Sequence, residues 1–227
     1  MSYTKVIFAF ILFLFPSIFF AQDNFISFWQ PGIALNYKVS KRYSHNFSIV
    51  HRNTIYDTND LQFRLRQLDL IHFSNFNIGL NQVFSVGLLY RFADIYDAGR
   101  FNEFRTTQQY NFTKRPAIVR YGHRLRAEQR FSSINTLYRF RYRFTLDLPL
   151  EGETLDIKET YLIGSSETLV TLASGLSPIY GQRFNLIFGW LISEKTKLQG
   201  GPEYRLSNFT GDTLHQLFLM TSLVFSL

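Results

Sequence analysis

The feature that most constrains this chain is a two-residue alternation of charged and apolar side chains between Val119 and Leu150. In residues 120–130 one parity carries arginines and a glutamate, and the other carries mainly aliphatic and aromatic residues. After a break at 132–135 the alternation resumes, with arginines set against tyrosines and phenylalanines. A period of two places successive side chains on opposite faces of a β-strand. This region therefore predicts two strands with one charged face and one aromatic face.

Similar segments follow one another along the chain, separated by turns rich in Gly, Asn, Asp and Ser. The remaining strands are expected at Ile33–Val39, Tyr43–Tyr56, Leu61–Leu80, Gln82–Ala93, Phe101–Phe112, Glu159–Leu172, Tyr180–Ser193, Thr196–Leu206 and His215–Ser226. The parity of the long third strand slips near Gln67, which predicts a β-bulge. Bacterial barrels prefer an even strand number, and Pro31-Gly32 is a turn dipeptide. We therefore count Phe25–Trp29 as a short twelfth strand, with ten strands as the alternative.

The first residues have the pattern of a secretory signal peptide. Lys5 supplies a positive charge, Val6–Phe15 is apolar, and Ser17–Ala21 leads to a cleavage position before Gln22. We expect residues 1–21 to be removed and residues 22–227 to form one domain. The chain has no cysteine, which excludes disulfides, a thiol nucleophile and a cysteine-ligated metal.

Two architectures could use strands of this kind. A soluble β-sandwich or lipocalin-like barrel would bury the aromatic face, whereas a membrane barrel would turn it toward lipid. Aromatic residues make up 18% of the chain and gather near strand ends, and the charged face is rich in arginine and poor in lysine. We therefore predict an all-β, transmembrane, antiparallel up-and-down barrel in the bacterial outer membrane, with a polar, arginine-rich lumen.

The expected partners follow from that location. They are outer-membrane lipid and the barrel-assembly machinery that inserts such proteins. The formal charge of +7 would suggest nucleic acid in a cytosolic protein, but a secreted chain with its arginines in strand alternation is not expected to bind it. The last strand, His215–Ser226, is expected to close the barrel against Ile33–Val39, because an open edge in lipid leaves backbone groups unsatisfied.

The charged face supplies one constellation of functional interest. It comprises Glu103, Arg105, Arg120, Arg124, Arg126, Glu128, Arg130, Arg139, Arg141, Arg143, Asp147, Glu167, Arg183, Glu203 and Arg205. With Arg64 and Arg91 added, arginine outnumbers acid in this set by twelve to five. The favoured interpretation is structural: arginine–glutamate ladders fill a narrow interior and hold the strand register. The alternative is a narrow anion-selective pore, or a site for an anionic ligand such as phosphate or a lipid headgroup.

No motif assigns an enzymatic activity. The chain has no glycine-rich phosphate loop, no zinc-protease helix and no nucleophile elbow, and its five histidines show no shared metal spacing. We therefore assign no catalytic residue, no cofactor and no metal. A lipid hydrolase or acyltransferase built on His123 with Ser132 or Ser133 is a less favoured alternative, because no spacing supports it.

Three strings resemble a known family. They are NEFRTTQQ at Asn102–Gln109, HRLRAEQRF at His123–Phe131 and YRFRYRFTLDLPL at Tyr138–Leu150, and a weaker likeness continues through QRFNLIFGW at Gln182–Trp190. They resemble domain-of-unknown-function family twenty-four ninety, whose members are expected to form outer-membrane β-barrels. Where this chain has Thr107, the family usually has an aromatic residue. The resemblance implies a fold and a compartment, and it brings no activity, cofactor or catalytic residue.

Overall fold

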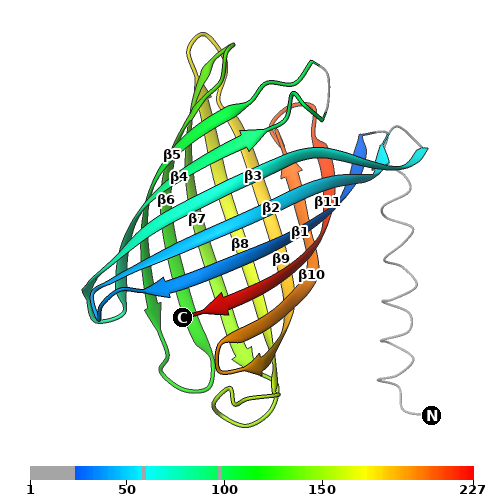
Figure 1. Ribbon diagram of the computed structural model, residues 1–227. Coiled ribbons are helices and arrows are strands. Elements are labelled where there is room, and N and C mark those ends of the chain that lie inside the picture. The colour runs from blue at the N-terminus through cyan, green and yellow to red at the C-terminus, as the bar shows by residue number, and fades with distance from the viewer. Residues whose placement is uncertain (1–23, 58–59, 97–98) are drawn as a thin grey trace, which may run out of the picture.

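The structure is a computed structural model, and it describes residues 24–57, 60–96 and 99–227. In these residues eleven β-strands form one closed barrel (Figure 1). The strands are β1 (Phe25–Lys38), β2 (Tyr43–Asp57), β3 (Asp60–Gly79), β4 (Gln82–Phe92), β5 (Glu103–Lys114), β6 (Arg120–Phe131), β7 (Thr136–Pro149), β8 (Thr160–Ala173), β9 (Ile179–Ser193), β10 (Thr196–Ser207) and β11 (Leu214–Ser226). Within the described ranges no helix is long and apolar enough to cross a membrane. The predicted signal peptide lies outside the described residues.

The barrel closes through a parallel pair. Each strand is antiparallel to its neighbours in the chain, but β1 and β11 run in the same direction. An odd number of alternating strands requires this, because the first and last then point the same way. The predicted seam is confirmed, with Ile33 opposite Leu223 and Leu35 opposite Phe225. In Figure 1 the first strand starts at the top of the barrel and the C-terminus lies at the bottom.

The predicted strand count was wrong, both as twelve and as ten. Phe25–Trp29 is no separate strand, because β1 runs without a turn through Pro31 and Gly32. The ladder between β1 and β2 skips from the Trp29–Asn53 pair to the Gly32–Val50 pair. Proline has no N–H to donate, so it is tolerated where the ladder is interrupted. The dipeptide that was interpreted as a turn is therefore a local irregularity in a long strand.

The bulge in β3 is confirmed. Arg52 of β2 is paired with Gln67, and the next residue, Asn53, is paired with Leu65. Arg66 is therefore the extra residue, and the side chains on either side of it change face. This change places Gln67 on the interior face of the barrel, where it is buried.

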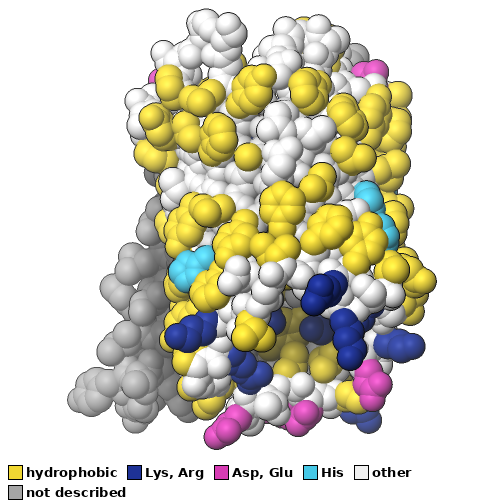
Figure 2. Space-filling model, turned by 90° about the vertical axis from the view of Figure 1, so that its left-hand side faces the viewer, with side chains coloured by type: hydrophobic (Ala, Val, Ile, Leu, Met, Phe, Trp, Pro, Cys, Tyr) yellow, Lys and Arg dark blue, Asp and Glu magenta, His cyan; other side chains and the backbone are white. Residues whose placement is uncertain are grey.

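The barrel exposes apolar side chains on its outer face and encloses charged ones, which is the reverse of the arrangement in soluble proteins. Phe188 is 52% exposed on the outside, whereas Glu128 is 1% exposed on the inside. In strands β4 to β11, every charged residue except Lys114, at the end of β5, shares the interior parity. Figure 2 shows one side of the barrel with hydrophobic side chains spread over the wall and basic side chains gathered at the bottom end.

Two glycines let aromatic rings lie flat against the inner wall. Gly87 is opposite Phe73 in the ladder, and a Cβ atom there would lie 2.3 Å from the Phe73 ring. Gly189 is opposite Tyr161, and a Cβ atom there would lie 2.2 Å from that ring. Both contacts require glycine, because no larger side chain leaves room for the ring. The interior is therefore packed by aromatic rings as well as by ion pairs.

The parallel seam predicts a specific cross-link. We expect the pair Ala34→Cys with Val224→Cys to form a disulfide in the folded chain, because these residues are Cα partners across the seam. Neighbouring strands lie about 4.8 Å apart, within the Cα separation that a disulfide needs. The measurement is mobility on a non-reducing gel, and the natural chain contributes no competing cysteine.

The matched control is Ala34→Cys with Ser222→Cys, which is two residues out of register on the same strand. That pair is separated by roughly 8 Å and should cross-link poorly. Efficient cross-linking of the control instead of the partner pair would show that the seam has a different register.

Candidate functional site

Strands β5 to β10 carry the charged residues singled out in the sequence. Glu103 and Arg105 lie on β5; Arg120, Arg124, Arg126, Glu128 and Arg130 on β6; Arg139, Arg141, Arg143 and Asp147 on β7; Glu167 on β8; Arg183 on β9; Glu203 and Arg205 on β10. Because these residues share the interior parity of neighbouring strands, their side chains meet inside the barrel.

Glu128 is the centre of this arrangement. Its carboxylate lies 2.7 Å from Nη2 of Arg141 and 2.9 Å from Nη2 of Arg130. Guanidinium nitrogens of Arg105 and Arg126 each lie 3.6 Å from it. Four cations therefore surround one buried anion, which compensates for the removal of its charge from water.

The ion pairs continue across the neighbouring strands. Arg141 also contacts Glu167, with Nη1 3.4 Å from Oε1. Glu167 is also buried, and it forms two further ion pairs. Its Oε2 lies 2.9 Å from Nε of Arg143, and its Oε1 lies 3.3 Å from Nη1 of Arg183. Arg141 thus joins two buried carboxylates. We call the continuous set from β5 to β9 the ion-pair ladder; its members are Glu103, Arg105, Arg126, Glu128, Arg130, Arg141, Arg143, Glu167 and Arg183.

Four members of the predicted set form pairs away from the ladder. Arg205 contacts Glu203, and Arg120 contacts Asp147. The Arg120 side chain is 56% exposed, so its pair lies at the bottom mouth of the barrel and is not enclosed. The separation follows from strand position, since Arg120 begins β6 and Asp147 lies near the end of β7.

Two arginines of the predicted set have no carboxylate partner among the described residues. Arg124 donates from Nε to Oδ1 of Asn111 at 3.1 Å, and Arg139 donates from Nε to Oγ1 of Thr171 at 2.7 Å. Neutral acceptors fix the orientation of each guanidinium but leave its charge uncompensated.

Asp69 was not among the residues predicted from the sequence. Its carboxylate accepts two parallel hydrogen bonds from Arg91, at 2.8 Å from Nε and 2.7 Å from Nη2. Gln67 donates to the same carboxylate at 3.1 Å. The parity slip in β3 was the available signal, because it turns Asp69 inward. Arg64, which was considered with the predicted set, is exposed on the part of β3 before the bulge.

An aromatic pair inside the barrel was also missed. The rings of Phe28 and Phe218 are stacked with their centroids 4.7 Å apart, and both side chains are buried. The guanidinium carbon of Arg205 lies 3.5 Å from the centroid of Phe218, and that of Arg52 lies 4.9 Å from it. A ring face attracts a cation most strongly away from water, so the pair supports both arginines. The signal was Phe218 itself, an aromatic residue on the polar parity of β11.

The side chains leave several cavities inside the barrel, and two of them adjoin the ion-pair ladder. The upper cavity, of about 320 Å³, lies where β5 begins and β6 ends, and the lower cavity, of about 600 Å³, lies where β5 ends and β6 begins. They share the side chains of Gln30, Arg183 and Arg205 as a common boundary. The upper cavity is lined by the arginines Arg52, Arg91, Arg105, Arg126, Arg130, Arg139, Arg141, Arg183 and Arg205. Its lining carboxylates are Asp69 and Glu128.

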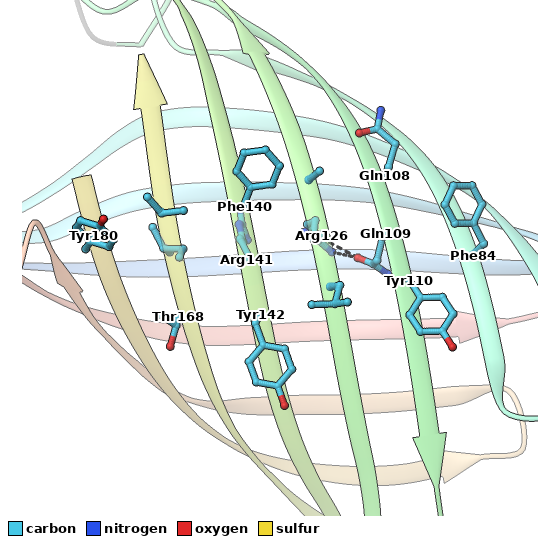
Figure 3. Close-up of a pocket in the computed structure, with 14 residues that line it drawn as sticks. Phe84, Gln108, Gln109, Tyr110, Arg126, Phe140, Arg141, Tyr142, Thr168 and Tyr180 are labelled. Carbon is cyan, nitrogen blue, oxygen red and sulfur yellow. Dashed lines mark hydrogen bonds between the residues drawn. The ribbon is translucent and has the colours of Figure 1, made fainter. Parts of the chain in front are cut away.

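A third hollow, of about 560 Å³, lies on the outer wall over β4 to β9. Figure 3 shows the rings of Phe84, Tyr110, Phe140 and Tyr142 around it. The hydrogen bond from Arg126 to Gln109 belongs to the interior face of the same strands. This groove is apolar, and the ladder residues Arg126 and Arg141, which also line it, form their ion pairs with Glu128.

The histidines and serines form no assembled catalytic site in the described residues. His123 lies near the start of β6 and contacts the Tyr142 hydroxyl at 2.9 Å, whereas Ser132 follows the end of β6 and bonds Asn135. Histidine 45 pairs with His72 at 3.0 Å on the outer wall. Within the described ranges no three His, Cys, Asp or Glu residues lie close enough to hold a metal ion.

Comparison with known proteins gives a family without an assigned function. No curated protein matches the chain. A crystal structure of the siderophore receptor PirA from Pseudomonas aeruginosa is similar at 16% identity, with a TM-score of 0.31, over 77% of this chain and 34% of that one. The chain thus spans about a third of the length of that receptor. The family described as "Protein of unknown function (DUF2490)" matches residues 27–216. This chain is a member of that family.

Proposed function

We propose that this protein is an outer-membrane β-barrel whose interior is held by the ion-pair ladder. The observation that carries the proposal is the reversed distribution of side chains across the wall. Aromatic and aliphatic residues cover most of the outside, and the charged residues within β4 to β11 face inward, except Lys114 at the end of β5. A closed barrel with that exterior suits hydrocarbon, because the strand ladders pair the backbone groups along most of the wall and the inward charges are kept away from lipid.

Polar side chains on the outer wall support this environment. Gln129 donates to Gln108 at 3.1 Å and accepts from the Thr106 hydroxyl at 2.5 Å. Gln182 similarly donates to Ser166 at 2.8 Å and accepts from Thr168 at 2.7 Å. Each group meets a neighbour rather than solvent, as polar side chains must where water is absent. The outer groove shown in Figure 3 would be filled by lipid acyl chains.

The ladder is proposed to be primarily structural. A barrel of this size is narrow, and its interior is filled largely by side chains. Each ladder carboxylate contacts at least two arginines, and at least one of them lies on a neighbouring strand. The ion pairs therefore connect several strands. Removing one partner from such a set leaves the others buried and uncompensated.

The location is tested by fractionation of cells that express the full chain. We expect the mature protein, cleaved before Gln22, in the outer-membrane fraction. We also expect it to run faster on a denaturing gel when unheated, as folded barrels do. Recovery of the cleaved chain in the soluble periplasm would contradict the proposal.

The structural role of the ladder is tested by Glu128→Gln. We expect this substitution to lower the free energy of unfolding by about 3–5 kcal/mol, because four guanidinium groups lose their shared anion. The matched control is Glu151→Gln in the exposed loop between β7 and β8, which should cost less than about 0.5 kcal/mol. The measurement is denaturant unfolding of both variants in detergent. Equal midpoints would argue against a structural ladder.

A second candidate function is a narrow anion-selective pore. The observation that favours it is the excess of arginine along the interior, including Arg124 and Arg139, which lack carboxylate partners among the described residues. Rings of positive side chains select anions in pores. The ladder lines both cavities, and Gln30, Arg183 and Arg205 form their common boundary, so the structural proposal and the pore proposal differ in whether an ion can pass these side chains.

Recording in planar bilayers separates the two candidates. With the ladder closed, we expect no steady current from the natural chain. In Arg141→Ser the side chain that joins Glu128 to Glu167 is removed, and we expect a small current whose reversal potential shows anion preference. An anion-selective current from the natural chain would favour the pore, and cation preference in either protein would contradict both forms of the proposal.

A further inference from the structure

The upper cavity holds more positive charge than the protein balances. Among the described residues nine arginines and two carboxylates line it. Three further carboxylates, Glu103, Glu167 and Glu203, pair with some of these arginines from outside the lining. Nine cations thus meet five anions, an excess of four. Buried charge without a partner is costly, so this excess favours an anionic occupant.

Arg139 and Arg52 are the arginines best placed to meet such an occupant. Arg139 donates a hydrogen bond from Nε to Thr171 at 2.7 Å, and Arg52 donates one from Nε to Gln30 at 3.2 Å. Neither has a carboxylate partner in the part of the chain that the structure describes. Arg141, on the same wall as Arg139, has a buried Nε atom without a hydrogen-bond partner. The cavity therefore offers oriented donors in addition to positive charge.

The cavity also has apolar lining residues on β2 to β4, the strands that continue the wall from β5. Val50 of β2, Ile71 and Phe73 of β3, and Leu89 of β4 line the cavity there. These residues share the interior parity of their strands, and the Phe73 ring lies flat over Gly87. These apolar side chains lie on the same strands as Arg52, Asp69 and Arg91, so the cavity offers apolar surface next to its charged groups. A bare inorganic ion would leave that apolar surface without a contact.

We propose that the upper cavity binds a small phosphate ester. Its phosphate group is held by Arg139 and the neighbouring arginines of β5 to β7, and its uncharged body packs on Val50, Ile71, Phe73 and Leu89. Planar guanidinium groups match the oxygens of phosphate, and a doubly charged group offsets the excess better than a monovalent anion. A volume of about 320 Å³ falls within the range of small-molecule sites.

The test is calorimetric titration of the full chain, folded in detergent, with three probes: phenyl phosphate, inorganic phosphate and phenol. We expect phenyl phosphate to bind about tenfold more tightly than inorganic phosphate, because its ring buries apolar surface. Phenol should not bind measurably. Equal affinity for the two phosphates, or no binding of phenyl phosphate, would overturn the proposal.

Arg139→Gln should weaken phenyl phosphate binding by about tenfold or more, since a charge-assisted contact is lost. Arg139→Lys keeps the charge without the planar fork and should give a smaller loss. The matched control is Arg124→Gln, which also removes an interior arginine bound to a neutral acceptor but lines only the lower cavity. Equal weakening by Arg124→Gln would show general attraction of anions to the barrel and would overturn the proposed site.

Ile71→Thr tests the apolar wall without touching an arginine. It should reduce the preference for phenyl phosphate over inorganic phosphate while leaving inorganic phosphate binding unchanged, and an unchanged preference would argue against the apolar contact. These measurements need only a folded barrel. Failure of the fractionation test would therefore leave the binding result standing, and failure of binding would leave the membrane location standing.

Discussion

The contact on which the barrel interior depends is the bridge that Arg141 makes between Glu128 and Glu167. Each carboxylate is almost completely buried, and each would be costly in that position without cations beside it. Because Arg141 contacts both, the arginines around one carboxylate are linked to those around the other. The strands from β5 to β9 are therefore coupled through their interior side chains as well as through their backbone ladders. The register of these strands therefore determines both the backbone hydrogen bonds and the ion pairs. A slip of one residue would turn the ladder side chains of the shifted strand to the outside.

The closure of the barrel follows from a separate constraint. An eleven-strand meander can close only by pairing β1 and β11 in parallel, which gives slanted hydrogen bonds and places the two ends of the barrel sequence on opposite rims. The seam is nevertheless continuous from Phe25 to Asn36 on β1. Its outward residues are mostly apolar on both strands, with Ser27, His215 and Thr221 as exceptions, and Trp29 donates a hydrogen bond to Thr221 across the seam.

The alternation of side chains was sufficient to predict ten of the strands, the bulge near Gln67 and the face on which the charged residues lie, because strand geometry fixes the face of a residue from its parity. It did not show that Arg120 and Arg64 would be exposed. It was insufficient for the strand count, since Pro31 has the same local signature in a turn and at a break in a ladder. It also missed Asp69, Arg52 and Phe218. Parity tells which residues face inward, but the partner of each one across the barrel depends on shear and on side-chain rotamers. Those are properties of the closed barrel and are not local in sequence.

The interior holds arginines in two kinds of setting. In the ladder every arginine contacts a carboxylate, although its six arginines outnumber its three carboxylates. The upper cavity departs from that pairing where Arg139 and Arg52 donate to neutral acceptors. Proteins tend to keep such locally unfavourable arrangements where they serve binding or activity. The same barrel thus carries a region of ion pairs that holds the register and a region of arginines, without ion pairs among the described residues, that is open to a ligand. Arg141 belongs to both, because it lines the cavity and completes the ladder.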